Sequence, residues 1–173
     1  MSLGRTCDDC LKDTGIRQVT VGATYQGHLK ELIRRLKFDR TQSAAILCAE
    51  LILAQFGSTS DVDAVTAVPV SPTRFRERGC NQSALIARIM AKRTGGPYAE
   101  TLRRSSGGHQ IGLGRHERLA AIYGAFTPIR RLDGLRVLVI DDVLTIGATL
   151  AECAAVLSSV GARTVSAATV ARR

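Results

Sequence analysis

The chain has 173 residues, of which 45% are hydrophobic and 23% charged, and its 24 Lys and Arg against 15 Asp and Glu give a formal net charge of +9. This is the composition of an ordinary globular domain, so it argues against a disordered chain, and no run approaches the ~20 apolar residues of a membrane-spanning helix. The five cysteines are odd in number and scattered, which argues against a disulfide framework. Residues 1–5 lack the apolar stretch of a secretory signal. We therefore expect a cytoplasmic protein with one core, reduced thiols and no membrane association.

Arginine accounts for 20 of the 24 basic residues. The planar guanidinium group can make two parallel hydrogen bonds to a phosphate, whereas the lysine ammonium group is a point charge. The excess of arginine therefore favours a nucleotide, a sugar phosphate or a nucleic acid as the partner. Genomic codon bias would give the same count, so the positions of the arginines along the chain must decide between these explanations.

The first half of the chain shows two helical patterns, a strand and a third helix. Apolar residues at helical spacing predict helices over 27–38 and 41–56. A short β-branched run predicts a buried strand over 64–68, which leads into a strongly basic loop. The third helix is predicted over 82–94, with Asn81 as its N-cap.

The second half of the chain also alternates between predicted strands and helices, with one interruption. A polar, glycine-rich excursion over 103–114 separates a short predicted strand over 98–102 from a predicted helix over 113–122. The chain then ends in a strand, a helix and a strand, over 135–140, 149–160 and 164–170. Alternating strands and helices predict an α/β fold, a mostly parallel sheet flanked by helices.

An acidic pair and a short loop follow the strand predicted over 135–140. Asp141 and Asp142 would lie beyond the carboxyl end of a parallel strand, where ligands bind in open sheets, and adjacent carboxylates can accept hydrogen bonds from a vicinal diol. The free amide groups of a loop that turns into a helix favour a phosphate. This loop comprises Leu144, Thr145, Ile146, Gly147, Ala148 and Thr149. The pattern predicts a ribose 5-phosphate site; the alternative is a solvated turn followed by a loop that only caps the helix.

Segment 137–149 resembles the phosphoribosyl diphosphate signature of type I phosphoribosyltransferases: four apolar residues, Asp-Asp-Val, any residue, Thr-Thr-Gly, any residue and Thr. Ile146 stands where the signature has its second threonine. Three further segments are similar to the competence protein F (ComF/GntX, amidophosphoribosyltransferase-like) family, at 25–38, 68–82 and 110–126. Cys80 and Ala121 depart from that pattern, which has phenylalanine and asparagine there. The resemblance extends from about residue 25 to residue 170.

The resemblance implies a type I phosphoribosyltransferase-like fold, with an N-terminal appendage at 1–20, a helical hood at 21–60 and the core at 61–173. It implies that phosphoribosyl diphosphate binds with Mg²⁺, that Asp141 and Asp142 are catalytic, and that phosphoribose passes to an unidentified nitrogen acceptor. The implied pyrophosphate loop comprises Arg74, Arg76, Arg78, Gly79, Asn81 and Gln82. The implied flexible lid comprises Arg103, Arg104, Gln110, Arg115 and Arg118.

Cys7 and Cys10 have the spacing of a zinc ligand pair, but a structural zinc site has four ligands and the sequence offers one such pair. In the family this pair forms half of an N-terminal zinc ribbon, so the resemblance implies a half-site for Zn²⁺.

Two other functions stay open at this stage. One is a competence-type accessory protein that binds single-stranded DNA, although 4% aromatic residues and no Trp give little for bases to stack on. The other is a sensor that binds phosphoribosyl diphosphate without turnover, which the missing hydroxyl at Ile146 favours. The sequence leaves the oligomeric state open, and a homo-oligomer is compatible with it.

Overall fold

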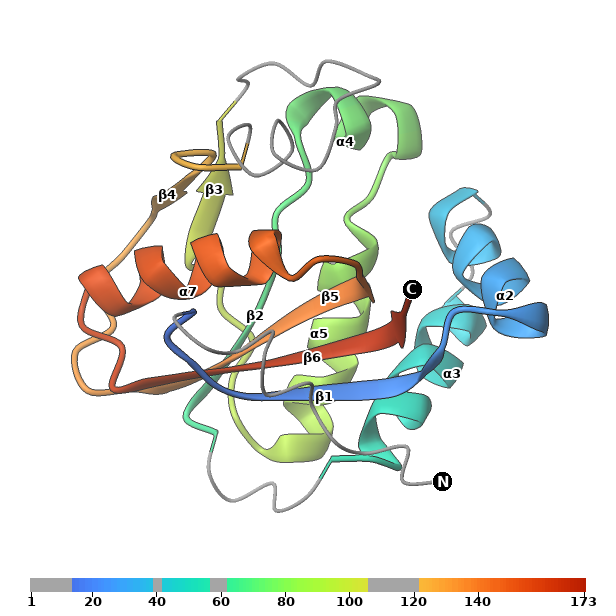
Figure 1. The fold of residues 1–173 in the computed structure, drawn as a ribbon, viewed down its shortest axis with the longest axis horizontal. Coiled ribbons are helices and arrows are strands. Elements are labelled where there is room, and N and C mark those ends of the chain that lie inside the picture. Colours follow the sequence, from blue (N-terminus) through green and yellow to red (C-terminus); the bar gives the residue numbers. More distant parts are fainter. Residues whose placement is uncertain (1–13, 39–41, 57–61, 106–121) are drawn as a thin grey trace.

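The computed structural model describes residues 14–38, 42–56, 62–105 and 122–173. Four strands form its main sheet in the order β1-β6-β5-β2, and all three pairings between neighbours are parallel (Figure 1). The strands are β1 (Ile16–Thr24), β2 (Ala64–Ala67), β5 (Arg136–Leu144) and β6 (Thr164–Arg172). The predicted mostly parallel sheet is confirmed.

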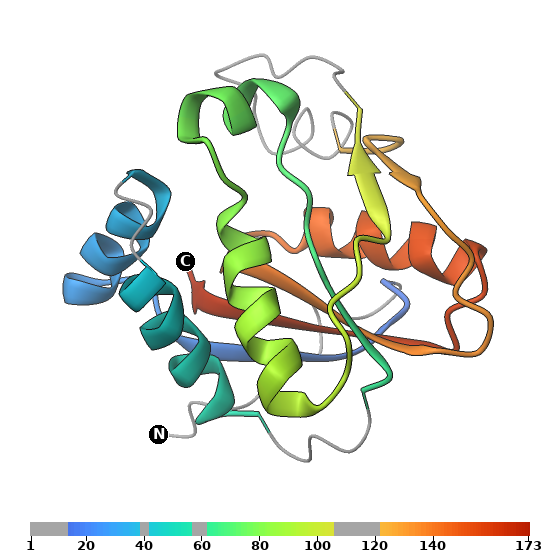
Figure 2. The same ribbon diagram turned by 180° about the vertical axis from the view of Figure 1, so that it is seen from behind.

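Helices cover both faces of this sheet (Figures 1 and 2). One face carries α3 (Gln42–Leu53) and α5 (Gln82–Thr94), with α2 (Gly27–Phe38) packed against α3, and the other carries α7 (Ala148–Ser159). Side chains alternate along β5, so that Leu138 and Ile140 join the core under α3 and α5 while Val137 and Val139 join the core under α7. In the described part of the chain, no helix is both long and apolar enough to span a bilayer.

The strand β1 is absent from the sequence prediction, and the predicted boundary at residue 20 falls inside it. Its alternation is irregular, because Arg17 and Gln18 are both exposed and the register shifts between Ile16 and Val19. Its partner β6 lies at the other end of the chain, so no local signal marks the pairing. Residues 16–24 therefore belong to the edge of the main sheet.

Two further segments differ from the prediction. The basic stretch after β2 is largely a helix, α4 (Pro72–Arg78), because Ser71 caps it, Pro72 fits its first turn and Gly79 ends it in the left-handed conformation with φ of 67°. The strand predicted over 98–102 lies later, as β3 (Leu102–Arg104), paired with β4 (Phe126–Pro128) in a small antiparallel sheet. Tyr98 forms only an isolated bridge to Val65.

Gly22 provides a test of how closely β1 approaches its neighbours. A Cβ atom at this position would lie 2.8 Å from the carbonyl oxygen of Val170 and 3.1 Å from the carbonyl carbon of Leu51, both backbone atoms. We predict that Gly22→Ala lowers the free energy of unfolding by about 1–3 kcal/mol, because backbone must move to admit the methyl group. Urea denaturation measures this change, and an unaltered midpoint would show that β1 is not packed this closely.

Candidate functional site

The acidic pair lies inside β5, because this strand runs four residues further than the sequence predicted, through Asp141 and Asp142 to Leu144. Val143 and Leu144 continue the parallel pairing with Ala171 and Arg172 of β6. Leu144, predicted as the first residue of the phosphate loop, is instead a buried strand residue that packs in the core under α7. The pair still lies at the carboxyl edge of the sheet, two residues before β5 ends.

Asp141 is held by α5 and by its own neighbour in the chain. Its Oδ1 atom accepts a hydrogen bond of 3.0 Å from the Ser83 hydroxyl and one of 2.8 Å from the Asp142 backbone N–H. Burial and the nearby charge of Asp142 raise the pKa of Asp141 to about 7. Thr169 of β6 lies in register with Asp141, and its buried hydroxyl has no partner among the described residues. This environment is polar and part-buried.

Asp142 has neighbours different from those of Asp141. Its Oδ2 atom lies 2.7 Å from the Lys37 ammonium group at the end of α2. Burial, followed by the charge of Asp142, raises the pKa of Cys48 on α3 to about 12. In the described part of the chain, Asp141 and Asp142 each keep one carboxylate oxygen without a protein partner.

The turn between β5 and α7 presents free amide groups. Gly147 is the N-cap of α7 with φ of 77°, and no side chain caps this end. Within the described residues, the backbone N–H groups from Thr145 to Thr149 donate to no protein acceptor. Such an end binds anions, because free N–H groups and the helix dipole point at the same place. A left-handed φ favours glycine, which explains this residue at the turn.

The residues of the predicted pyrophosphate loop have structural partners. Asn81 caps α5 by accepting from the Ala84 N–H at 3.3 Å, and its Nδ2 atom donates to the Val68 carbonyl at 3.0 Å. Arg78 donates to the Oε1 atom of buried Gln82 at 3.3 Å. These contacts fix the end of α4 to the start of α5, above the end of β2.

One cavity brings the predicted pyrophosphate and lid segments together. It encloses about 670 Å³ between α4 and β3, and its lining includes Arg76, Asn81, Arg103 and Arg104. Arg103 and Arg104, predicted in an irregular excursion, are strand residues of β3, because they pair with β4. The guanidinium group of Arg104 lies 5.3 Å from the centre of the Phe126 ring. Burial, then the neighbouring charge of Arg74, lowers the pKa of Arg104.

Five predicted site residues lie outside the described part of the chain: Cys7, Cys10, Gln110, Arg115 and Arg118. No group of three or more His, Cys, Asp or Glu side chains suited to a metal occurs among the residues that the structure describes.

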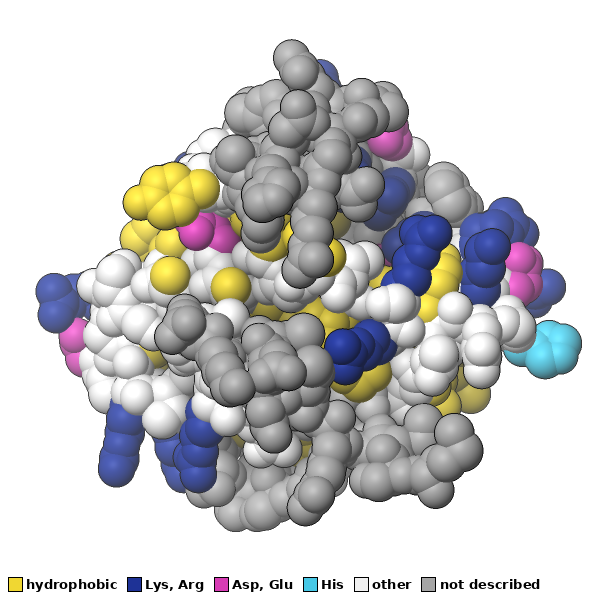
Figure 3. Space-filling view, viewed as in Figure 1, with side chains coloured by type: hydrophobic (Ala, Val, Ile, Leu, Met, Phe, Trp, Pro, Cys, Tyr) yellow, Lys and Arg dark blue, Asp and Glu magenta, His cyan; other side chains and the backbone are white. Residues whose placement is uncertain are grey.

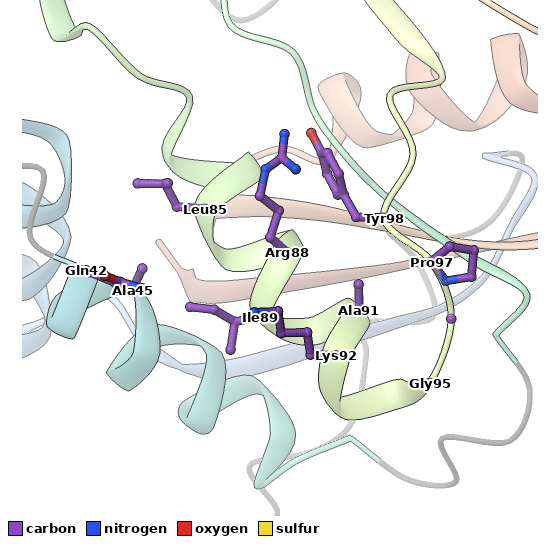
Figure 4. Close-up of a pocket in the computed structure, with 11 residues that line it drawn as sticks. Gln42, Ala45, Leu85, Arg88, Ile89, Ala91, Lys92, Gly95, Pro97 and Tyr98 are labelled. Carbon is purple, nitrogen blue, oxygen red and sulfur yellow. The ribbon is translucent and has the colours of Figure 1, made fainter.

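Basic side chains gather over the right-hand part of the face seen in Figure 3, where the parallel strands end and α2 begins. A separate cavity of about 950 Å³ lies between α3 and α5 (Figure 4). There Arg88 stacks over Tyr98 at 4.1 Å from the ring centre. No predicted site residue lines this second cavity.

Comparison with known proteins identifies the family. The DNA utilization protein YhgH of Salmonella typhimurium is 30% identical over 168 residues, which cover 92% of this chain and 74% of that protein. The chain belongs to this ComF-like family. The competence protein ComFC of Streptococcus pneumoniae is 25% identical over 167 residues, covering 94% of this chain and 73% of that protein. No family model matches the chain.

Solved structures similar to this ComF-like chain include two phosphoribosyltransferases. An adenine phosphoribosyltransferase from Thermoanaerobacter pseudethanolicus has a TM-score of 0.48 and 15% identity, covering 78% of this chain and 83% of that one. A purine phosphoribosyltransferase from Pyrococcus horikoshii has a TM-score of 0.43 and 13% identity, covering 88% of both chains.

Sequence reasoning missed two residues that contact the acidic pair, Lys37 and Ser83. Lys37 lies in segment 25–38, which resembles the ComF-like pattern, and Ser83 directly follows Asn81 and Gln82. Position within a family segment is therefore a signal that could have found both. Their contacts with residues 58 or more positions away in the chain are visible only in three dimensions.

The raised pKa of Asp141 predicts a pH dependence of stability. The pKa of this carboxyl group is near 4 in the unfolded chain and about 7 in the folded protein, so between these values the folded state binds more protons. The contribution of Asp141 to stability is therefore present below about pH 4 and is lost as pH rises toward 7. We predict a flatter profile for Asp141→Asn over this range, measured by urea denaturation at half-unit pH steps. Parallel profiles for the two proteins would contradict the raised pKa.

Proposed function

We propose that this protein binds phosphoribosyl diphosphate at the carboxyl edge of its sheet and transfers phosphoribose to a nitrogen acceptor. The observation that supports this most directly is that one short segment carries two kinds of ligand-binding group. Two carboxylates lie at the end of β5, and the uncapped N-terminus of α7 with its free amide groups follows them. Carboxylates accept hydrogen bonds from sugar hydroxyls, and a helix N-terminus binds a phosphate. A ribose 5-phosphate unit contains both partners.

The carboxylates would bind the ribose through the oxygens that have no partner in the described structure. Asp141 offers Oδ2 and Asp142 offers Oδ1, because the other oxygen of each is already bonded. At a pKa of about 7, roughly half of Asp141 is protonated at neutral pH, so it is able to donate as well as accept a hydrogen bond. Donor binding is then expected to depend on pH near neutrality.

The 5-phosphate would lie at the turn, within reach of the N–H groups from Thr145 to Thr149. Ile146 supplies no hydroxyl there, so backbone amides and the hydroxyls of Thr145 and Thr149 are left as donors. Arg76 and Arg104 line the cavity beside α4 and would attract the diphosphate group.

The oxygen groups at this edge fit Mg²⁺ held mainly by the donor itself. The described structure offers two carboxylates and the unpartnered Thr169 hydroxyl, but no cluster of three metal ligands. Mg²⁺ prefers oxygen ligands and usually binds through one or two carboxylates together with substrate phosphates. When bound, the ion would neutralise charge on the departing diphosphate.

In the proposed reaction, a nitrogen lone pair forms a bond to C1 of the ribose while the bond from C1 to the diphosphate oxygen breaks. Positive charge develops on the sugar ring, and the carboxylate of Asp142 would stabilise it, while the arginines would stabilise the leaving diphosphate. A sensor that binds the donor without turnover uses the same groups. Donor binding without consumption in the presence of nitrogen acceptors would favour the sensor.

Calorimetric titration with phosphoribosyl diphosphate and Mg²⁺ tests the binding site. We predict that the wild-type protein binds the donor and that Asp142→Asn weakens binding about tenfold or more, because a hydrogen bond to a charged acceptor is lost.

Asp133→Asn is the matched control, because Asp133 is an exposed carboxylate paired with Arg131 and takes no part in the proposed site. Equal, negligible heats for the wild type and both variants would overturn the proposed binding of phosphoribosyl diphosphate.

Binding of single-stranded DNA is a second candidate, supported by the names of the relatives and by one surface feature. Phe75 on α4 is 51% exposed and has Arg74 and Arg76 as its chain neighbours. An exposed ring between cations is suited to stack a base while arginines contact phosphates. This helix also borders the cavity described above.

Filter binding of a single-stranded oligonucleotide over a salt series tests this candidate. We predict that log affinity falls steeply with log salt concentration and that Phe75→Ala weakens binding about tenfold, as expected for one lost stacking contact. Leu47→Ala, which removes an equally exposed apolar side chain from α3, should leave binding unchanged. A salt slope near zero would rule out a nucleic-acid backbone as the ligand.

A further inference from the structure

The ion pair between Lys37 and Asp142 differs in exposure from the other ion pairs of the described structure. The two side chains are 22% and 16% exposed, and Nζ lies 2.7 Å from Oδ2. The other ion pairs have side chains between 30% and 80% exposed. Because solvent screens an ion pair less as it is withdrawn from water, the Lys37 pair orients its partners more firmly than a surface pair does.

The packing of α2 fixes the position of Lys37. Ile33 and Leu36 on the same helix are fully buried in the core that α2 shares with α3 and α5. Arg34 and Arg35 are exposed and pair with Glu31, so they are held away from the sheet. Lys37 is therefore the basic residue of the last turn of α2 that contacts the acidic pair.

The ion pair between Lys37 and Asp142 places a positive charge at the carboxyl edge of the sheet, where α2 meets it. Asp142 is adjacent to a second carboxyl group, since its backbone N–H donates to Asp141, and the charge of Asp142 raises the cost of charging Asp141. The positive charge of Lys37 reduces this cost, and Arg104 also interacts electrostatically with Asp141. The ammonium group uses Oδ2 of Asp142 and leaves Oδ1 without a partner in the described structure.

We propose that Lys37 is a positioning residue of the donor site, holding the Asp142 carboxylate by Oδ2 so that Oδ1 accepts a hydrogen bond from a ribose hydroxyl. This role rests on the proposed function. The rest of the site is formed by β5, the turn after it and α7. In this proposal a residue of α2 also contributes, because Lys37 makes the site prefer a sugar with a complete diol. Without the ammonium group, the carboxylate would be free to rotate and would be repelled by its neighbour.

The substitution Lys37→Met tests this role, because methionine keeps the length and helix propensity of lysine and removes its charge. The matched control is Lys30→Met, which removes an exposed lysine from the same helix. Calorimetry compares ribose 5-phosphate with 2-deoxyribose 5-phosphate, which lacks one hydroxyl of the diol. We expect the wild type and Lys30→Met to prefer ribose 5-phosphate, and Lys37→Met to lose about tenfold in affinity for it while its affinity for the deoxy sugar changes little. Lys37→Arg should restore part of the preference.

A second measurement needs no ligand. Carbon NMR of the Asp141 carboxyl group should show a higher pKa in Lys37→Met than in the wild type, because the ammonium group lowers it, and no change in Lys30→Met. An unchanged Asp141 titration in Lys37→Met would overturn the proposed role of Lys37.

The binding results separate the two proposals. If the wild type binds neither sugar phosphate nor phosphoribosyl diphosphate, the proposed function is wrong and the role of Lys37 is wrong with it. If the wild type binds with the diol preference and Lys37→Met retains it, only the role of Lys37 is wrong. Tighter binding by Lys37→Met would show that the ammonium group competes with the sugar, and this too would overturn a positioning role.

Discussion

The parallel pairing of β5 with β2 on one side and β6 on the other is the constraint on which the site depends. It buries the apolar half of β5 between two helical layers and brings Asp141 and Asp142 to the carboxyl edge of the sheet. Because α7 follows β5 after a three-residue turn, its N-terminus lies at the same edge. The ends of α4 and α2 reach this edge from two sides. Chain segments far apart in sequence thus meet at one place.

The two carboxylates have different electrostatic surroundings although they are adjacent in the chain. Burial raises the pKa of Asp141 to about 7, and the Ser83 hydroxyl of α5 donates a hydrogen bond to it. Asp142 points to the face that carries α2 and α3 and forms an ion pair with Lys37. This difference follows from the separate segments that reach the two carboxylates, the start of α5 for Asp141 and the end of α2 for Asp142. A site with one carboxyl group that is about half protonated at neutral pH and one in an ion pair is suited to hydroxyl ligands, because it offers both an acceptor and a donor.

The two proposed ligands, a sugar diphosphate and a nucleic acid, both carry phosphate groups. They differ in what they require beyond positive charge. The sugar diphosphate requires the carboxylates and the free amides of α7, whereas the nucleic acid requires an exposed ring such as Phe75 among arginines. The carboxylates and the amides lie on other elements than Phe75, so substitutions of these groups should separate the two ligands, whereas Arg76 is part of both proposals.

The sequence by itself determined the fold class, four of the helices, three of the four strands of the main sheet and the family, because hydrophobic periodicity, caps such as Asn81 and motif residues are local signals. It also marked Asp141, Asp142 and Gly147 as neighbours at a strand end. Only the tertiary structure decided that β1 joins the sheet, that Lys37 and Ser83 contact the acidic pair, and that Arg76 and Arg104 share a cavity. The physical reason is that these features depend on which distant segments pack together. Packing decides which strands pair, which side chains are buried and which charges lie close to each other, and no short stretch of sequence specifies it.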